Sequence, residues 1–247
     1  FSLAEFHNIM IESNVNLIWL GEIHGINETN DIILQFFNQY NYPVKLFVEW
    51  ADIRQKNINQ YLIDKDCNSI SWIDSVHQDG KYSLSMVNLL DSISKRRNIL
   101  VYCYDVQNNS ELNRDSMMAI NIKKYISSDT LSIILSGNVH NIIDDEYSIS
   151  NFSSKSAYSY LKSMTSNRLH SLSINQIIGS GYAWSCINDT CGNQYFKHQS
   201  DVKNQLHQNS SFCYLFPEKD STYPWDGFIY LDTVTPSRPW STIICKP

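Results

Sequence analysis

Short apolar runs alternate along the chain with longer segments in which apolar residues recur every three or four positions. Four runs are continuous and almost uncharged: Asn16–Leu20, Val44–Val48, Asn98–Tyr104 and Leu131–Leu135. Continuous runs of this length predict strands that are buried on both faces, as a parallel sheet requires. The alternating run Leu169–Ile174 and the apolar run Gly227–Asp232 predict two later strands.

Helical spacing occupies most of the remaining chain. It predicts helices over residues 3–14, 27–40, 52–63, 84–96, 112–127 and 156–164, while residues 66–82 and 185–212 are polar and rich in turn residues. Alternation of strands with helices implies right-handed crossovers. We therefore predict one α/β domain over residues 1–247, with three layers and helices flanking a mainly parallel sheet. A polar C-terminal excursion and a late, antiparallel strand complete the prediction.

Composition and charge narrow the function classes. Of the 247 residues, 43% are apolar and 18% are charged, which gives enough apolar surface for a hydrophobic core. The net charge of −6 argues against a nucleic-acid partner, whose phosphates require a basic face. No run of 18 or more apolar residues occurs, so the sequence predicts no transmembrane segment.

The six cysteines bear on the compartment. Cys186 and Cys191 bracket a turn-like sequence, and two interpretations remain open: a short-loop disulfide, or a zinc site that includes His198. The even cysteine count, together with a first residue that is Phe1 and not methionine, favours an exported chain. We therefore expect a secreted or periplasmic location.

Ionisable side chains follow each of the four predicted parallel strands. The first strand is followed by Gly21-Glu22-Ile23-His24-Gly25, the second by Glu49, the third by Asp105 and the fourth by Gly137-Asn138-Val139-His140. Ligands of open α/β sheets bind beyond the carboxyl ends of the strands. Each group alone is commonly a hydrogen-bonded loop residue, but two equivalent Gly-X-X-His steps beside two glutamates predict an active cleft.

Other ionisable residues have a simpler interpretation. We interpret the remaining five histidines as surface or core residues: His7, His77, His170, His198 and His207. Asp115 is interpreted as a partner for Arg114 or Lys123 on its own helix. No Gly-X-Ser-X-Gly motif occurs and no cysteine lies beside the histidine loops, so a covalent nucleophile is not predicted.

These residues, in this order, resemble the erythromycin esterase/ChaN-like superfamily, which includes erythromycin esterases, ChaN-like haem-binding lipoproteins and the Tiki/TraB proteins. The resemblance rests on the two histidine steps, Glu49, the helix start Arg114-Asp115-Ser116-Met117-Met118-Ala119 and the late strand Trp225–Asp232. It implies a bacterial α/β protein with one shared cleft, built from Glu22, His24, Glu49, Arg114 and His140.

A hydrolase is the first function that this cleft suggests. His24 or His140 would activate water against an ester, lactone or peptide bond, because imidazole titrates near neutral pH. Glu22 or Glu49 would orient that imidazole, and Arg114 would stabilise the developing oxyanion or bind an anionic substrate group. The substrate would be a small molecule or a peptide.

A metal-assisted variant uses the same residues. Two histidines and a carboxylate are a familiar hydrolytic metal set. The ligands would be His24, His140 and either Glu22 or Glu49, and zinc, manganese or cobalt would suit them.

Two alternatives belong to other classes. The ChaN branch of the resemblance implies a haem-binding protein of iron uptake, which needs a ligand facing an apolar slot. A toxin or effector module that acts through its surface is the other, and the polar segment 185–212 would suit it.

Overall fold

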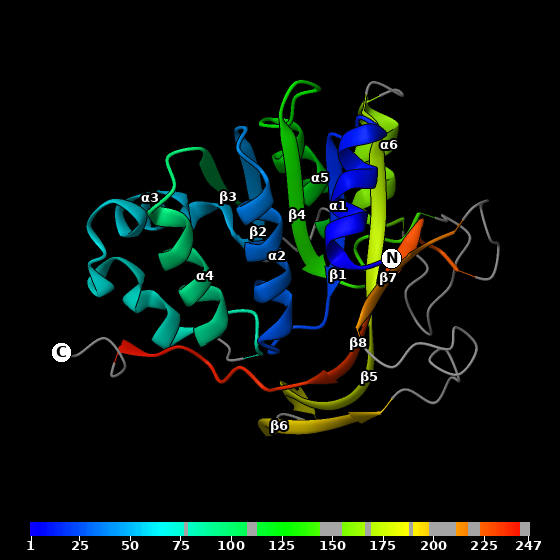
Figure 1. The fold of residues 1–247 in the computed structure, drawn as a ribbon. Coiled ribbons are helices and arrows are strands. Elements are labelled where there is room, and N and C mark those ends of the chain that lie inside the picture. The colour runs from blue at the N-terminus through cyan, green and yellow to red at the C-terminus, as the bar shows by residue number, and fades with distance from the viewer. Residues whose placement is uncertain are drawn as a thin grey trace.

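The computed structural model describes residues 1–76, 79–107, 113–143, 155–165, 169–187, 190–197, 211–216 and 223–242. Eight strands in these ranges form one sheet in the order β3-β2-β4-β1-β5-β8-β7, with β6 paired to β5 (Figure 1). They are β1 (Leu17–Glu22), β2 (Val44–Ala51), β3 (Ile99–Asp105), β4 (Leu131–Gly137), β5 (Ser171–Ile187), β6 (Thr190–Lys197), β7 (Phe212–Leu215) and β8 (Gly227–Val234).

Helices cover both faces of this sheet. One layer contains α1 (Leu3–Glu12), α2 (Glu28–Gln39), α3 (Gln55–Asp64), α4 (Leu84–Ser94) and the 3-10 helix η2 (Cys67–Ser75), and the short 3-10 helix η1 (Asp52–Arg54) links β2 to α3. The other layer contains α5 (Arg114–Lys123) and α6 (Ala157–Thr165). In Figure 1, α1, α2 and α4 lie in front of the strands and α5 and α6 lie behind them.

Alternation along the buried strands explains the two layers. Successive side chains of a strand point to opposite faces. On β1, Ile18 and Leu20 pack in the core beneath α1–α4, whereas Leu17 and Trp19 pack in the smaller core beneath α5 and α6. A strand that serves two cores must be apolar throughout, and this confirms the three-layer, mainly parallel fold that the continuous runs predict.

The late part of the sheet contains more regular structure than the sequence suggests. β5 continues to Ile187 and folds back as β6, so part of the predicted excursion 185–212 is an antiparallel hairpin. Residues 188–189 and 198–210 of that segment lie outside the described residues. β8 pairs parallel with β5 and antiparallel with β7. The segment 66–82, which the sequence predicts to be rich in turns, contains the 3-10 helix η2.

A disulfide joins Cys186 to Cys191, which face each other across the β5–β6 pair with Cα atoms 3.9 Å apart. Of the two interpretations of these cysteines, the structure therefore has the short-loop disulfide. His198, the further zinc ligand of the other interpretation, lies outside the described residues. Among the helices of the described ranges, none combines the length and hydropathy that crossing a membrane requires.

One close approach fixes the loop that carries His140. The next residue, Asn141, is fully buried, and its amide occupies the space in which a Cβ on Gly21 would lie, 2.5 Å from the amide oxygen. The Asn141 amide nitrogen donates to the carbonyl of Ile174. Asn141, which follows β4, therefore packs against the adjacent strand β1 and hydrogen-bonds to β5, the strand on the far side of β1.

Truncating the core tests this packing. Leu135 lies fully buried on β4, so Leu135→Ala should lower the free energy of unfolding by about 2–5 kcal/mol through lost burial and a cavity. Leu100 on β3 is 52% exposed, and Leu100→Ala should change stability by less than about 0.5 kcal/mol. Urea unfolding of both variants measures the difference, and equal losses would contradict the assignment of β4 to the core.

Candidate active site

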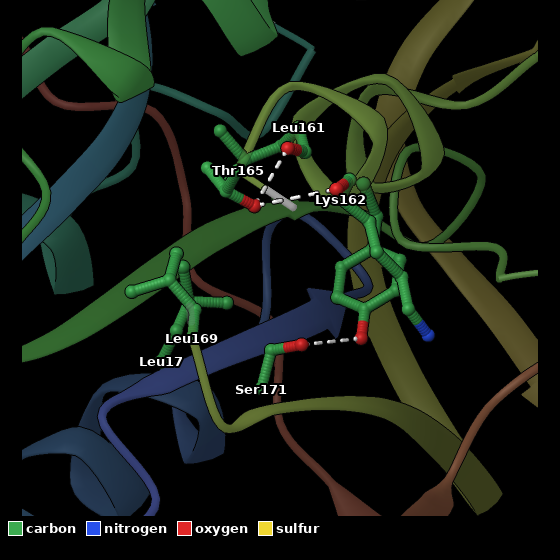
Figure 2. Close-up of a pocket in the computed structure, with 7 residues that line it drawn as sticks. Leu17, Leu161, Lys162, Thr165, Leu169 and Ser171 are labelled. Atoms are coloured by element: carbon green, nitrogen blue, oxygen red, sulfur yellow. Dashed lines mark hydrogen bonds between the residues drawn. The ribbon is translucent and has the colours of Figure 1, made fainter. Parts of the chain in front are cut away.

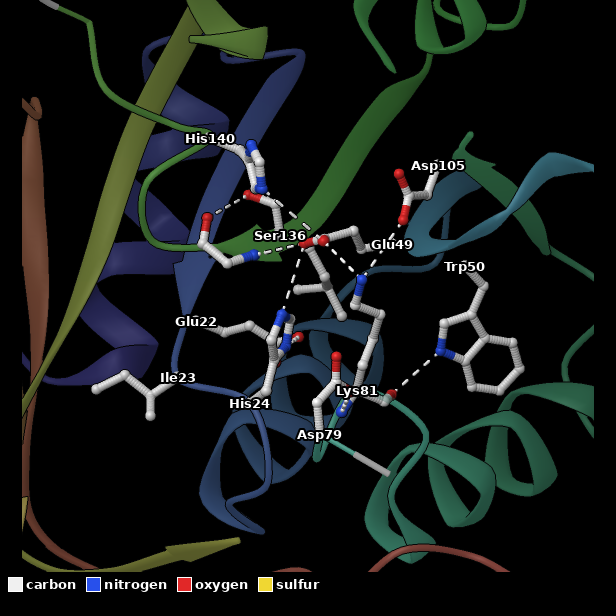
Figure 3. Close-up of polar contacts among 12 residues, drawn as sticks. Glu22, Ile23, His24, Glu49, Trp50, Asp79, Lys81, Asp105, Ser136 and His140 are labelled. Carbon is white, nitrogen blue, oxygen red and sulfur yellow. Dashed lines mark hydrogen bonds and ion pairs between the residues drawn. The ribbon is translucent and has the colours of Figure 1, made fainter. Parts of the chain in front are cut away.

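The carboxyl ends of β1, β2, β3 and β4 bring together all five side chains that the sequence proposes. Glu22 ends β1 and His24 follows it, Glu49 lies near the end of β2, and His140 follows β4. Arg114 comes from the start of α5, where the Asn113 side chain accepts a hydrogen bond from Ser116 N. Figure 3 shows the two histidines on opposite sides of Glu49, with Lys81 and Asp105 beside it.

His24 is oriented by Glu22. Its Nδ1 lies 3.0 Å from Oε1 of Glu22, a carboxylate that is buried. A carboxylate can only accept a hydrogen bond, so Nδ1 carries the proton and Nε2 holds the lone pair of the neutral ring. Gly25, at φ +78°, turns the chain immediately after the histidine, in a conformation that residues with a Cβ rarely adopt.

His140 has a matching carboxylate partner, Asp115. The Nδ1 of His140 lies 2.8 Å from Oδ1 of Asp115, whose other oxygen accepts a hydrogen bond from the amide of Ala157 at 3.1 Å. The interpretation of Asp115 as an ion-pair partner on its own helix is therefore wrong. Its position one residue after Arg114, in the first turn of α5, is the signal that could have identified it.

Glu49 occupies the centre of the cluster. The ladder between β2 and β4 ends at the pair Phe47–Ile134, and beyond it the amide of Gly137 donates to Oε2 of Glu49 at 2.7 Å. Lys81 and Arg114 donate to Oε1 at 3.0 and 2.7 Å. Burial alone would raise the pKa of this carboxyl, but the charge of Lys81, followed by the other positive groups, lowers the pKa far below its ordinary value.

Asp105 completes a network of alternating charge around the buried carboxylate of Glu49. Arg114 donates to its two oxygens from Nε at 2.8 Å and from Nη2 at 2.9 Å, and Lys81 lies 3.4 Å away. Burial would lower the pKa of either cation, but the two carboxylates raise the pKa of both Lys81 and Arg114. Both cations therefore stay charged throughout the neutral range.

Lys81 is the member of this network that sequence reasoning missed. It lies in the polar segment 66–82, far from any predicted strand end, and its surroundings carry no helical or strand periodicity. Asp79 accepts from its main-chain amide, and its carbonyl accepts from the indole of Trp50. These contacts, seen in Figure 3, place the Lys81 loop over the end of β2.

The two histidines differ in the state of Nε2. Arg114 Nη1 lies 3.3 Å from Nε2 of His140, and because arginine can only donate, it engages the lone pair of that ring. Nε2 of His24 lies 3.6 Å from Oε2 of Glu49 and 3.4 Å from the point where a Cβ on Gly137 would lie. A Cβ at Gly137 would lie within ordinary contact distance of His24, Glu49 and His140, so the absence of a side chain there leaves a small gap between these three groups.

The pKa of His24 is raised above its ordinary value of 6.5. Burial opposes the charged imidazolium, but the hydrogen bond to Glu22 and the negative charges of Glu49 and Glu22 outweigh that effect and the repulsion from Lys81. A protonated His24 presents both N–H groups to carboxylates. The ring is therefore a stronger base than a free imidazole.

A divalent cation does not fit the donors proposed from the sequence. Glu22 binds Nδ1 of His24, while both oxygens of Glu49 accept from Lys81, Arg114 and the amide of Gly137. Within the part of the chain that the structure describes, no three histidine, cysteine, aspartate or glutamate side chains are placed to hold one cation.

A haem ligand would need to face an apolar slot, and His24 and His140 are instead surrounded by charged groups. A cavity of about 30 Å³ lies at the amino-terminal ends of the central strands β1 and β5, away from the proposed site (Figure 2). It is far below the ~300–1,000 Å³ of ligand pockets. Its lining residues are Leu17, Tyr158, Leu161, Lys162, Thr165, Leu169 and Ser171.

No family model and no curated protein matches the sequence. Three solved structures share its fold. An erythromycin esterase variant in its open conformation has a TM-score of 0.69 at 9% identity, covering 96% of this chain and 95% of its own. A succinoglycan biosynthesis protein reaches 0.65 at 9% identity, covering 96% and 92%. A Bacillus cereus protein reaches 0.61 at 12%, covering 98% and 94%. The fold implied by the resemblance is confirmed.

The charge network makes a testable contribution to stability. Glu49→Gln should lower the free energy of unfolding at pH 7 by about 3–5 kcal/mol, because it leaves Lys81 and Arg114 short of a buried anion. The folded-state pKa of Glu49 is lowered, so its contribution is present above the unfolded value of 4.5 and is lost as pH falls.

Urea unfolding at pH 7 and pH 3 measures this effect, and the difference between wild type and Glu49→Gln should be smaller at pH 3. Glu12→Gln, on the exposed side of α1, is the control and should leave the unfolding midpoint unchanged. A Glu49→Gln curve that matches wild type at both pH values would show that the network contributes nothing.

Proposed function

We propose that the chain is a hydrolase in which His24 removes a proton from a water molecule that attacks an ester, lactone or peptide carbonyl. The observation that carries this proposal is the difference between the two rings. Nε2 of His24 lies beside Gly137, which has no side chain, whereas Arg114 already engages Nε2 of His140. The His24 side chain is 20% exposed and that of His140 is 8% exposed, so water reaches His24 more readily.

Glu22 supports His24 in this role. It fixes the tautomer whose lone pair lies on Nε2, and it stabilises the imidazolium that forms when water loses its proton. The raised pKa of His24 strengthens the base at the cost of requiring a higher pH to deprotonate it. The pair resembles the base and orienting carboxylate of hydrolytic triads, without their nucleophile.

His140 and Arg114 form the other half of the proposed machinery. The Arg114 side chain is 39% exposed, and its Nη1 lies beside His140 at the mouth of the site. A guanidinium in this position stabilises negative charge that develops on the carbonyl oxygen. Asp115 holds His140 in the orientation that keeps it against Arg114.

The surroundings of Ser136, the hydroxyl at the end of β4, favour water and not a serine as the nucleophile. Ser136 is fully buried, its Oγ accepts from the indole of Trp19 at 2.7 Å and donates to the carbonyl of Gly137 at 3.0 Å. A hydroxyl held by two buried partners is not available to attack a substrate. This supports water as the nucleophile.

An oxidising compartment suits the cysteine chemistry. Cys186 and Cys191 are joined, and Cys67 is also disulfide-bonded. Disulfides persist in secreted and periplasmic proteins and are rare in the reducing cytosol. We therefore infer that the hydrolase acts in a secreted or periplasmic setting.

Replacing either histidine tests the assignment. His24→Ala and His140→Ala should each lower kcat/KM by about 10²–10⁴-fold, the usual contribution of a general acid–base group. A panel of chromogenic esters, lactones and peptides measures the rates, and circular dichroism checks folding. His170→Ala, at an exposed position, is the control and should keep full activity. Full activity in His24→Ala would remove His24 from the mechanism.

The pH profile tests the role of Glu22. The base works only when neutral, so kcat/KM should rise with pH through a His24 pKa above 6.5. Glu22→Gln removes the charge that raises this pKa, so the rising limb should move to lower pH while the maximum rate falls. An unshifted limb in Glu22→Gln would mean that Glu22 does not set the protonation of the base.

A further inference from the structure

Three main-chain segments meet beside the proposed active site. Gly25 follows His24, Gly80 precedes Lys81, and Trp184 lies on β5 just before the hairpin disulfide. The amide of Trp184 donates to the carbonyl of Gly25 at 2.9 Å. The loops that carry one histidine and one lysine of the charged cluster therefore share a single contact point on the hairpin.

The approach at this point excludes a side chain at Gly25 and at Gly80. A Cβ on Gly25 would lie 2.1 Å from the carbonyl oxygen of Trp184, and a Cβ on Gly80 would lie 2.6 Å from the same oxygen. The same Cβ on Gly80 would lie 2.9 Å from the amide nitrogen of Gly25. Both glycines have positive φ, +78° and +94°, so the backbone conformation imposes the same requirement independently.

The hairpin is anchored on its other side. Pairing between β5 and β6 runs from Ser180–Lys197 to Ile187–Thr190, and the disulfide joins Cys186 to Cys191 within that ladder. The opposite face of the hairpin packs against the main core: Ala183 is fully buried, and Phe196 of β6, which pairs with Gly181, is partly buried against that core. The main chain at Trp184 is therefore held by packing and by a covalent bond two residues away.

The chain near residues 235–240 holds the same loops from a second direction. The amide of Ser237 donates to the carbonyl of Gly25 at 2.8 Å, and the amide of Trp240 donates to the carbonyl of Tyr82 at 3.0 Å. The carbonyl of Gly25 thus accepts from both sides. Neither loop can move outward without breaking contacts to the hairpin or to this segment.

We propose that the disulfide-closed β5–β6 hairpin is a positioning element for His24 and Lys81, acting through the main chain of Trp184. The hairpin presses the two loops together above the ends of β1 and β2. This keeps His24 between Glu22 and Glu49, and it keeps the ammonium of Lys81 3.0 Å from Glu49. The activity readout of this inference rests on the proposed hydrolase function, whereas the titration of His24 does not.

Three charged groups face His24 and set its protonation as long as the hairpin keeps the loop in place. They are Glu22 from β1, Glu49 from β2 and Lys81 from the neighbouring loop. If the hairpin loosens, the His24 loop moves away from the two carboxylates. The histidine then approaches the behaviour of a solvated imidazole, and the base loses its alignment with water.

The experiment compares three variants with a matched control. Gly25→Ala and Gly80→Ala place a Cβ against Trp184. The double change Cys186→Ser/Cys191→Ser removes the disulfide that closes the hairpin and alters neither loop. Gly192→Ala is the control, because a Cβ there meets nothing within 4 Å. The ring protons of His24, assigned by their loss in His24→Ala, are followed by NMR as pH is varied, and kcat/KM is measured on the same samples.

We expect the pKa of His24 to fall toward its ordinary value in all three variants and to stay as in wild type in Gly192→Ala. Misplacement by about 1 Å costs about 100-fold in rate, so Gly25→Ala should lose activity on that scale and the double cysteine variant less. A glycine variant that fails to fold leaves the double cysteine variant, which retains both glycines, to give the answer.

Two outcomes would overturn the proposal. In the first, the folded double cysteine variant keeps the wild-type His24 titration and the wild-type kcat/KM. In the second, it unfolds more easily but each folded molecule titrates and reacts as wild type, which would make the hairpin a stabilising element only. If wild type hydrolyses no substrate, the proposed function fails, and the His24 titration still decides whether the hairpin positions the loop.

Discussion

A buried carboxylate, Glu49, is the group on which the site depends. Its side chain is almost inaccessible, and an ion in that environment is unstable unless other groups replace its lost hydration. Lys81, Arg114 and the amide of Gly137 make that replacement from three separate parts of the chain. Glu49 therefore ties the loop before α4, the start of α5 and the end of β4 to the end of β2.

This arrangement distinguishes the central charge network from the two histidines beside it. Glu49 and Asp105 are engaged by Lys81 and Arg114, so these four side chains hold one another in place. The histidines lie on either side of that scaffold and receive their orienting carboxylates from elsewhere, Glu22 and Asp115. A network of this kind holds two imidazoles whose Nε2 atoms have different surroundings, as the proposed proton transfer by His24 requires.

The sequence predicted the strands that are buried on both faces, because a local run of apolar residues identifies them. Runs such as Leu131–Leu135 are apolar because both faces of β4 are buried, and the polar residue after each run marks the carboxyl edge where Glu49 and His140 lie. Lys81 was missed because its position depends on long-range packing of a non-periodic loop. The hairpin was missed because its β6 strand has alternating exposure with polar residues such as Asn193, which local pattern cannot distinguish from loop.

The contact between Gly21 and Asn141 has a consequence for how such sequences can diverge. The Asn141 amide occupies the volume that any larger residue at position 21 would need, and it hydrogen-bonds to Ile174 of β5. Neither residue can change alone without a collision or a void next to the His140 loop. Descendants of this chain should therefore show the two positions covarying, with Gly21 retained wherever Asn141 is retained, whichever substrate the lineage has come to use.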